Sequence, residues 1–154
     1  GAMVKGTGFW LNNSLGEIDL LTRGVSGLSS GTRLASNMAP TIARRRGDGA
    51  LLALGSPGAS RITTAIAQVL ANFAGRNMSL ADAVTRPRLH VELAAQPGTI
   101  AFEPGLPVVP IQGLEPRPFD GPSMYFGGVQ AVLWSRRDGL AGIADARRGG
   151  YVAG

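Results

Sequence analysis

Residues 51–66 read Leu-Leu-Ala-Leu-Gly-Ser-Pro-Gly-Ala-Ser-Arg-Ile-Thr-Thr-Ala-Ile, and this stretch decides how the chain folds. An apolar run ends in a turn of small residues at 55–60, and a helical pattern follows at once. Small side chains let a ligand approach the backbone closely, and the free N–H groups at a helix N-terminus favour negative charge. An oxyanion formed during acyl transfer is one such charge. The stretch therefore predicts an anion-stabilising element whose nucleophile comes from elsewhere.

The segments on both sides of this stretch predict a strand-rich fold. Strand-like runs flank a Gly-Asp-Gly turn at 47–49 and an Arg-Asp-Gly turn at 137–139, so a hairpin is expected at each. The Pro-rich residues 104–122 predict a long irregular connection, and the polar residues 145–154 predict a frayed tail. The predicted strands cover residues 8–15, 41–46, 50–54, 90–93, 99–103, 129–134 and 140–144.

Two helices are predicted between the two sets of strands. Apolar residues recur at helical spacing over 62–73, with Ser60 as the expected N-cap and Gly75 as the stop. The run Ser79-Leu-Ala-Asp82 has the spacing of a capping box and opens a second helix, which must end before Pro87. Strands, then two helices, then strands indicate an α+β fold with a mostly antiparallel sheet.

Composition excludes several classes of protein. The 154 residues suffice for one domain with a core, and a hydrophobic content of 44% argues against intrinsic disorder. No apolar run reaches the ~20 residues of a membrane span. Without cysteine, thiol catalysis and disulfides are excluded, and no His, Asp or Glu group has metal-ligand spacing, so neither metal nor cofactor is expected. No targeting signal follows the scar-like residues 1–3, which leaves the compartment undetermined.

The net charge of +5 includes three small groups of arginine, at 44–46, 136–137 and 147–148. These groups are not interleaved with aromatic residues, as a surface that stacks nucleic-acid bases requires. Solvated turns or strand edges are therefore expected at all three groups, and no nucleic-acid partner is expected.

Nucleophilic chemistry has few candidates in this sequence. The turn at 55–60 lacks the Gly-x-Ser-x-Gly of a nucleophile elbow and the Gly-Lys-Ser/Thr end of a P-loop. His90 is the only histidine, so a Ser-His-Asp triad would have to use it. A single histidine in an alternating strand is more often a half-buried structural residue, and we favour that interpretation.

Two polar clusters suit the charged ends of a small molecule. Residues 12–17 place amides, a hydroxyl and a carboxylate together, which suits an ammonium group. Residues 35–41 offer neighbouring hydroxyl and amide donors, which suit a carboxylate. Ordinary turns that satisfy their own backbone are the simpler interpretation of both clusters on composition alone, and both interpretations stay open.

Taken in order, six motifs resemble the small subunit of γ-glutamyltransferases. They are Leu11-Asn-Asn13, Ser36-Asn-Met-Ala-Pro-Thr41, Leu54-Gly-Ser-Pro-Gly-Ala-Ser-Arg-Ile62, Pro87-Arg-Leu-His90, Gly127-Gly-Val-Gln130 and Asp145-Ala-Arg147. The resemblance runs over about residues 6–147, and the Gly-Ser-Pro-Gly block is its most specific part. It implies an N-terminal-nucleophile hydrolase with an αββα sandwich, matured by an autocleavage that exposes a threonine acting as both nucleophile and base.

The resemblance also implies roles for single residues. Gly58 and Ala59 match a Gly-Gly pair whose backbone N–H groups form the oxyanion hole. The methyl group that Ala59 adds leaves less room for a substrate to approach these N–H groups. Ser36 and Asn37 match paired serines that hold the substrate α-carboxylate, and Asn37 can still donate a hydrogen bond.

The ammonium-binding positions depart further from the family pattern. Ser14 and Glu17 match a glutamine and an aspartate that hold the substrate α-amino group. Glu17 keeps the charge on a longer side chain, whereas Ser14 is a shorter partner. A relaxed amidase or acylase specificity, which some relatives of the family have, is therefore plausible beside strict selection of γ-glutamyl donors.

The resemblance places the catalytic threonine upstream of the Leu-Asn-Asn motif, where this sequence offers only Thr7. Thr7 lies between two glycines at a place that the family treats as loop. We therefore expect no nucleophile in this chain and no turnover by the chain alone. A large-subunit segment, which supplies an arginine to the α-carboxylate in the family, is the implied partner.

Two functions stay open at this point. The first is a truncated small-subunit segment, covering residues 4–147 before a tail at 148–154, of an enzyme that hydrolyses or transfers γ-glutamyl amides such as glutathione. The second is a non-catalytic remnant that binds a small ligand or a protein. In both cases a sheet that lacks its sandwich partner exposes apolar surface, so self-association through an edge strand is expected.

Overall fold

The computed structural model describes residues 2–17, 21, 24, 27–93 and 96–153, and it separates into two compact units, Gly1–Asn37 and Met38–Gly154. In the described part of the first unit, Met3 and Trp10 form an isolated bridge and η1, a 3₁₀ turn, covers Ser14–Gly16. Trp10 is 67% exposed, so the predicted buried strand at 8–15 is wrong. The run instead folds back on residues 2–4, because Gly6 has a positive φ of 79° that permits a tight turn.

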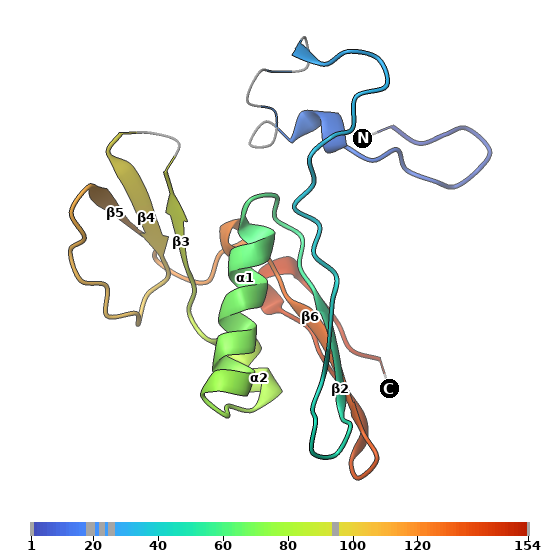
Figure 1. The fold of residues 1–154 in the computed structure, drawn as a ribbon, viewed down its shortest axis with the longest axis vertical. Helices are drawn as coiled ribbons and strands as arrows, with labels where there is room; N and C mark the ends of the chain where they lie inside the picture. Colours follow the sequence, from blue (N-terminus) through green and yellow to red (C-terminus); the bar gives the residue numbers. More distant parts are fainter. Residues whose placement is uncertain (1, 18–20, 22–23, 25–26, 94–95, 154) are drawn as a thin grey trace. The chain divides into compact units, whose positions relative to one another are not determined.

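The larger sheet of the second unit has four antiparallel strands in the order β1-β2-β6-β7, of which Figure 1 labels β2 and β6. Its strands are β1 (Thr41–Arg44), β2 (Leu51–Gly55), β6 (Gln130–Ser135) and β7 (Gly139–Ile143). Arg44 pairs with Leu51, and Ser135 pairs with Gly139. Both predicted hairpins are therefore confirmed, because a Gly-containing turn between two strand-like runs fixes the local register.

Two helices cover one face of this sheet. Helix α1 (Arg61–Leu70) continues into the π-helical turn η4 (Ala71–Gly75), and α2 (Leu80–Thr85) ends before Pro87 as predicted. The core lies between the helices and the sheet (Figure 1). Its buried residues are Leu52, Leu54, Ile62, Ala65, Ile66, Val69, Leu80, Ala83, Val84, Val129 and Ala131.

The two predicted helix caps have different outcomes. Ser79 caps α2, because its hydroxyl oxygen accepts a hydrogen bond from the Asp82 N–H at 3.0 Å. Ser60 does not cap α1: its backbone is already helical, with φ −59° and ψ −20°, and its side chain makes no cap bond. That prediction is wrong because the turn closes earlier: the Gly58 carbonyl already accepts from the Arg61 N–H, which places Ser60 inside the first helical turn.

A smaller sheet packs β3 (Leu89–Glu92) antiparallel to β4 (Gly98–Phe102), which pairs in parallel with β5 (Leu114–Pro118). β5 corrects the prediction of an irregular connection over 104–122. It tolerates Pro116 and Pro118 because it is an edge strand, in which alternate residues donate to the neighbour: the Phe119 N–H donates to the Phe102 carbonyl at 2.9 Å.

The outer edge of β3 is occupied by a side chain of α1. The Gln68 amide donates to the Leu89 carbonyl at 2.9 Å, and its oxygen accepts from the Leu89 N–H at 3.0 Å. This pair of bonds fixes the small sheet to the helix that follows the turn at 55–60.

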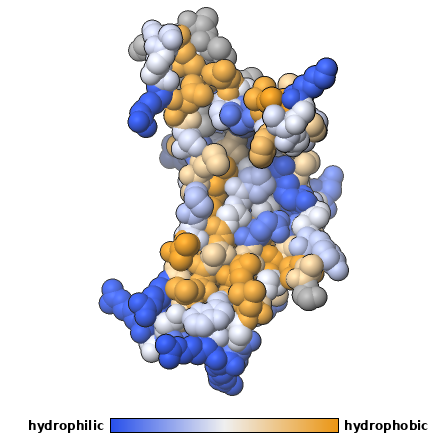
Figure 2. Space-filling view, turned by 90° about the vertical axis from the view of Figure 1, so that its right-hand side faces the viewer, coloured by the Kyte–Doolittle hydropathy of each residue, from blue (hydrophilic) through white to orange (hydrophobic). Residues whose placement is uncertain are grey.

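The second face of the four-stranded sheet is apolar and exposed. The register aligns Ile42, Ala53 and Val132 in one row, and Leu51, Trp134 and Leu140 in the next. The large residues of both rows are exposed, and Figure 2 shows apolar side chains gathered on this side of the molecule.

In the described part of the chain, no helix is long and apolar enough to cross a membrane. The predicted α+β class with mostly antiparallel sheets and two main helices is confirmed.

Candidate active site

The turn at 55–60 joins β2 to α1, and Gly58 and Ala59 set its backbone. Their φ angles are 130° and 49°, and for alanine such a left-handed conformation costs on the order of 1 kcal/mol. The Gly58 carbonyl accepts from the Arg61 N–H at 2.8 Å, and the Ala59 carbonyl accepts from the Ile62 N–H at 3.2 Å. Among the residues that the structure describes, neither the Gly58 N–H nor the Ala59 N–H donates a hydrogen bond. Both donors at the head of α1 are therefore available to an anion.

A glycine pair holds the first half of this turn in place. The Ser56 hydroxyl oxygen accepts from the Gly128 N–H at 3.0 Å, while the hydroxyl donates to the Pro57 carbonyl at 2.8 Å. A Cβ added to Gly127 would lie 2.6 Å from Ser56 Oγ and 3.0 Å from the Pro57 carbonyl oxygen. A Cβ added to Gly58 would lie 3.2 Å from the Gly127 Cα, so turn and loop pack backbone against backbone.

Arg61 anchors the other end of the turn to two further elements. Its Nη2 lies 3.1 Å from Glu92 Oε1 on β3, and its guanidinium carbon lies 4.4 Å from the ring centroid of Tyr125. Tyr125 belongs to the 3₁₀ turn η5 (Met124–Phe126), and its hydroxyl donates to Glu92 Oε1 at 2.6 Å. Burial, and then the hydrogen bond to Glu92, raise the pKa of Tyr125. Our sequence analysis missed this cluster because its members are up to 64 positions apart and follow no motif.

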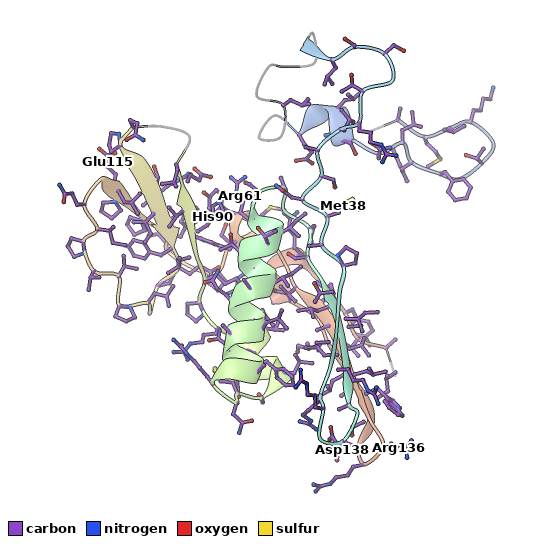
Figure 3. All side chains as sticks on the ribbon, viewed as in Figure 1. Met38, Arg61, His90, Glu115, Arg136 and Asp138 are labelled. Carbon is purple, nitrogen blue, oxygen red and sulfur yellow. The ribbon has the colours of Figure 1, made fainter. Side chains whose placement is uncertain are left out.

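His90 is buried beside the same cluster. Its Nδ1 lies 3.0 Å from Thr64 Oγ1 on α1, and its ring meets the Tyr125 ring edge-on at 6.3 Å (Figure 3, where Arg61 and His90 are labelled). A hydrogen bond between β3 and the side of α1 agrees with the structural role that we favoured for this histidine.

Behind the turn, four charged side chains form a buried network. Arg88 Nη2 lies 2.7 Å from Asp145 Oδ2, and Arg147 Nη2 lies 2.6 Å from Glu103 Oε2. Arg147 Nη1 also lies 3.2 Å from Asp145 Oδ1, which joins the two pairs. Glu103 Oε2 also accepts a hydrogen bond from the Arg88 backbone N–H at 2.9 Å. The network holds two arginines and two carboxylates, so its charges balance.

This network corrects two predictions about the C-terminal residues. Arg147 belongs to one of the arginine groups expected in solvent, yet its side chain is only 3% exposed. The polar run from Asp145 was expected to fray, but Asp145 is buried and caps the 3₁₀ turn η6 (Ala146–Arg148). Arg147 pairs with Glu103, which lies 44 positions earlier, and Asp145 pairs with the buried Arg88, so both residues belong to the core of this unit. The groups at 44–46 and 136–137 do lie at exposed hairpin turns.

The pKa of Asp145 makes stability depend on pH. Burial alone would raise it, but the Arg88 charge and the N–H groups of Arg147 and Val129 outweigh burial and lower the pKa below its usual value. A carboxylate with a lowered folded pKa stabilises the fold above its unfolded pKa of about 3.9 and loses that contribution as pH falls through the folded value.

We therefore expect the stability advantage of the unaltered chain over Asp145→Asn to shrink below about pH 4. Urea unfolding of both chains between neutral pH and pH 2.5 measures this difference, with Asp120→Asn at an exposed carboxylate as the control. An advantage that stays constant over this range would contradict the assignment to Asp145.

The predicted substrate-binding residues lie in the first unit. Ser14 begins η1, its N–H donates to Asn12 Oδ1 at 3.0 Å, and its carbonyl accepts from the Glu17 N–H at 3.4 Å. The structure thus brings Ser14 and Glu17 into one turn, in which an Asx-type bond is present. Ser36 is exposed and Asn37 is half-buried at the end of this unit.

Gly58 and Ala59 belong to the second unit, so a common site with these four residues stays a prediction. Among the residues described, no three acidic or histidine side chains are grouped in a way that could hold a metal ion.

Comparisons with known proteins agree over the whole chain. A family model described as gamma-glutamyltranspeptidase matches residues 1–154. The glutathione hydrolase proenzyme of Bacillus subtilis (strain 168) is 29% identical over 158 residues, which cover 100% of this chain and 26% of that protein. The acylase ACY 1 proenzyme of Pseudomonas sp. (strain SE83) is 31% identical over 150 residues, which cover 96% of this chain and 26% of that protein.

Solved structures give the same result. The gamma-glutamyltranspeptidase from Pseudomonas nitroreducens complexed with L-DON matches with a TM-score of 0.68 at 28% identity, and the match covers 99% of this chain and 84% of that one. The chain spans about a quarter of the length of the curated relatives that it matches.

Proposed function

This chain belongs to the gamma-glutamyltranspeptidase family and shares the fold of its N-terminal-nucleophile hydrolases, and we propose on that premise that it forms the oxyanion-stabilising segment of such an enzyme. The enzyme would hydrolyse γ-glutamyl amides such as glutathione, or transfer their γ-glutamyl group. The observation that carries the proposal is the pair of N–H groups at Gly58 and Ala59, which no other described residue engages at the head of α1.

The proposed reaction is acyl transfer through a threonine. The threonine hydroxyl attacks the γ-carbonyl carbon, and its proton passes to the α-amine of the same threonine. The tetrahedral oxyanion accepts hydrogen bonds from Gly58 and Ala59. Its collapse breaks the bond from carbon to nitrogen, the threonine ammonium returns the proton to that nitrogen, and the amine leaves behind an acyl-enzyme. Water or an amino-acid acceptor then completes the cycle. This chain matches about a quarter of its relatives' length. The catalytic threonine, and the arginine that a large-subunit segment supplies, would come from other parts of the enzyme.

The substrate's α-amino and α-carboxylate groups have proposed partners in the first unit. Glu17 and Ser14 would hold the ammonium group, and Ser36 and Asn37 would hold the carboxylate. A second candidate function, hydrolysis of amides that lack the α-amino group, has two supports. Ser14 is shorter than the glutamine that the family pattern has there, and a relative at 31% identity is named an acylase.

Release of p-nitroaniline tests both functions. We would compare this chain with an extended protein that adds the upstream threonine and the large-subunit segment, using γ-glutamyl-p-nitroanilide and glutaryl-p-nitroanilide, which lacks the α-amino group. Turnover of the γ-glutamyl substrate by the extended protein alone is the expected result. In that protein, Glu17→Gln should raise KM for the γ-glutamyl substrate at least tenfold, the cost of about one charged contact, and leave the glutaryl substrate unchanged.

Other outcomes of this test separate the alternatives. Turnover by this chain alone would contradict the need for an external nucleophile. Preference of the extended protein for the glutaryl substrate would establish the acylase function in place of the first. Inactivity on both substrates would favour a non-catalytic module that binds a small ligand or a protein, which calorimetry with glutamate and glutathione would then probe.

The exposed apolar face supports a proposal about assembly. In an αββα sandwich each sheet buries one face on the other, so the rows around Val132 and Trp134 would meet the second sheet of the extended protein. We propose that this chain on its own self-associates through an edge strand, β1 or β7, of the same sheet. A monomeric mass in light scattering at millimolar concentration would contradict this proposal.

A further inference from the structure

The turn at 55–60 contains a residue with a strained backbone, Ala59, and no side-chain cap at the start of α1 stabilises it. Ala59 has a positive φ, and such a conformation persists only where its surroundings over-determine it. Helix α1 has no side-chain cap, because Ser60 accepts a hydrogen bond from Arg61 Nη1 at 3.0 Å and makes no bond to the helix N-terminus. Contacts from outside the turn must therefore fix the directions of the Gly58 and Ala59 N–H groups.

Both ends of the turn are held by one short segment, residues 124–128. At the first end Gly128 donates to Ser56, as described above. At the second end Tyr125 lies under the Arg61 guanidinium and donates to Glu92, which is also the ion-pair partner of Arg61. Arg61 is the first residue of α1, and its N–H closes the turn on the Gly58 carbonyl. A shift of this arginine therefore moves the donor that closes the turn.

We propose that Glu92 and Tyr125 are positioning residues that act through Arg61 on the oxyanion-stabilising turn. In this role they act on the turn through Arg61 and not through contact with the substrate. The Tyr125 hydroxyl and the Arg61 guanidinium meet on one oxygen of Glu92, so that the carboxylate orients the first residue of α1. This role rests on the proposed function for its effect on catalysis, but its effect on the backbone of the turn can be measured without any turnover.

The first arm of the test uses this chain alone, labelled with ¹⁵N. Tyr125→Phe keeps the aromatic ring and removes the hydroxyl, and Glu92→Gln keeps the shape and removes the charge. Both are expected to shift the amide resonances of Gly58 and Ala59. Glu115→Gln, at an exposed carboxylate on β5 (Figure 3), is the matched control and should leave them in place. Resonances that stay fixed in both variants would overturn the proposal, whatever the enzyme does.

The second arm uses the extended protein. Each variant should lower kcat roughly tenfold and leave KM for γ-glutamyl-p-nitroanilide unchanged, because it weakens an interaction that matters only when the oxyanion forms. A matching rise in KM with unchanged kcat would overturn the positioning role. If the resonances move but the unaltered extended protein has no activity on either anilide, the proposed function fails and the positioning of the turn stands.

Discussion

Replacing Asp145 with alanine is expected to cost the second unit about 3–5 kcal/mol, because it leaves a buried arginine without its counter-charge. Asp145 is 1% exposed and accepts hydrogen bonds from Arg147 and from the Val129 N–H as well as pairing with Arg88. A loss of this size is a large part of the 5–15 kcal/mol that stabilises an ordinary domain. Urea unfolding followed by circular dichroism measures the loss directly.

The exposed pair of Arg45 and Asp48 is the matched control. Asp48→Ala removes a carboxylate from an arginine in the same way, but the two side chains are 62% and 51% exposed at a hairpin turn. Water replaces the lost partner there, and the other described bond that is lost comes from the Ala50 N–H at 3.1 Å, so the loss should be several times smaller than that of Asp145→Ala. Equal losses in the two variants would show that burial does not set the strength of the Asp145 interaction.

Gly127→Ala is expected to have the second large effect, a loss of roughly 2–4 kcal/mol together with displacement of the turn at 55–60. The residue has a φ of 79°, and its Cβ would meet the Ser56 hydroxyl and the Pro57 carbonyl. The hydroxyl cannot yield easily because it is held by Gly128, and the carbonyl belongs to the backbone of the turn.

Gly139→Ala separates the two causes of this loss. Gly139 has a φ of 72°, but a Cβ there would meet nothing within 4 Å. It should therefore show only the backbone cost of about 1 kcal/mol. Thermal unfolding of both variants makes the comparison, and a loss at position 127 no larger than that at 139 would exclude the contact with the turn as a cause.

Local chemistry explains which elements could be predicted from the sequence. The hairpins at 47–49 and 137–139 follow from turn residues between apolar runs, and α1 follows from the spacing of its buried face. β5 could not be predicted because its two prolines argue against a strand unless its place at a sheet edge is known. The run at Phe9 failed for the opposite reason, since in the described part of the first unit it pairs only through the isolated bridge of Met3 and Trp10.

The candidate site also has one part that the sequence predicts and another part that it does not. The turn with Gly58 and Ala59 is visible in the sequence because its residues are consecutive. The pairing of Arg147 with Glu103 and of Arg61 with Glu92 joins positions 44 and 31 residues apart, which no spacing rule connects. Charged residues in the sequence look alike whether they end in solvent or in a buried network, and only the fold decides.

The two sheets differ in their capacity to recruit further strands. Pro116 and Pro118 have no N–H to offer at the outer edge of β5, and Gln68 already occupies the Leu89 backbone groups at the outer edge of β3. The small sheet thus offers fewer backbone groups for templated growth at both of its edges. β1 and β7 contain no proline within their bounds. Fibrillar polymerisation during expression or storage would accordingly start from the large sheet, and that is where a solubilising lysine should be introduced.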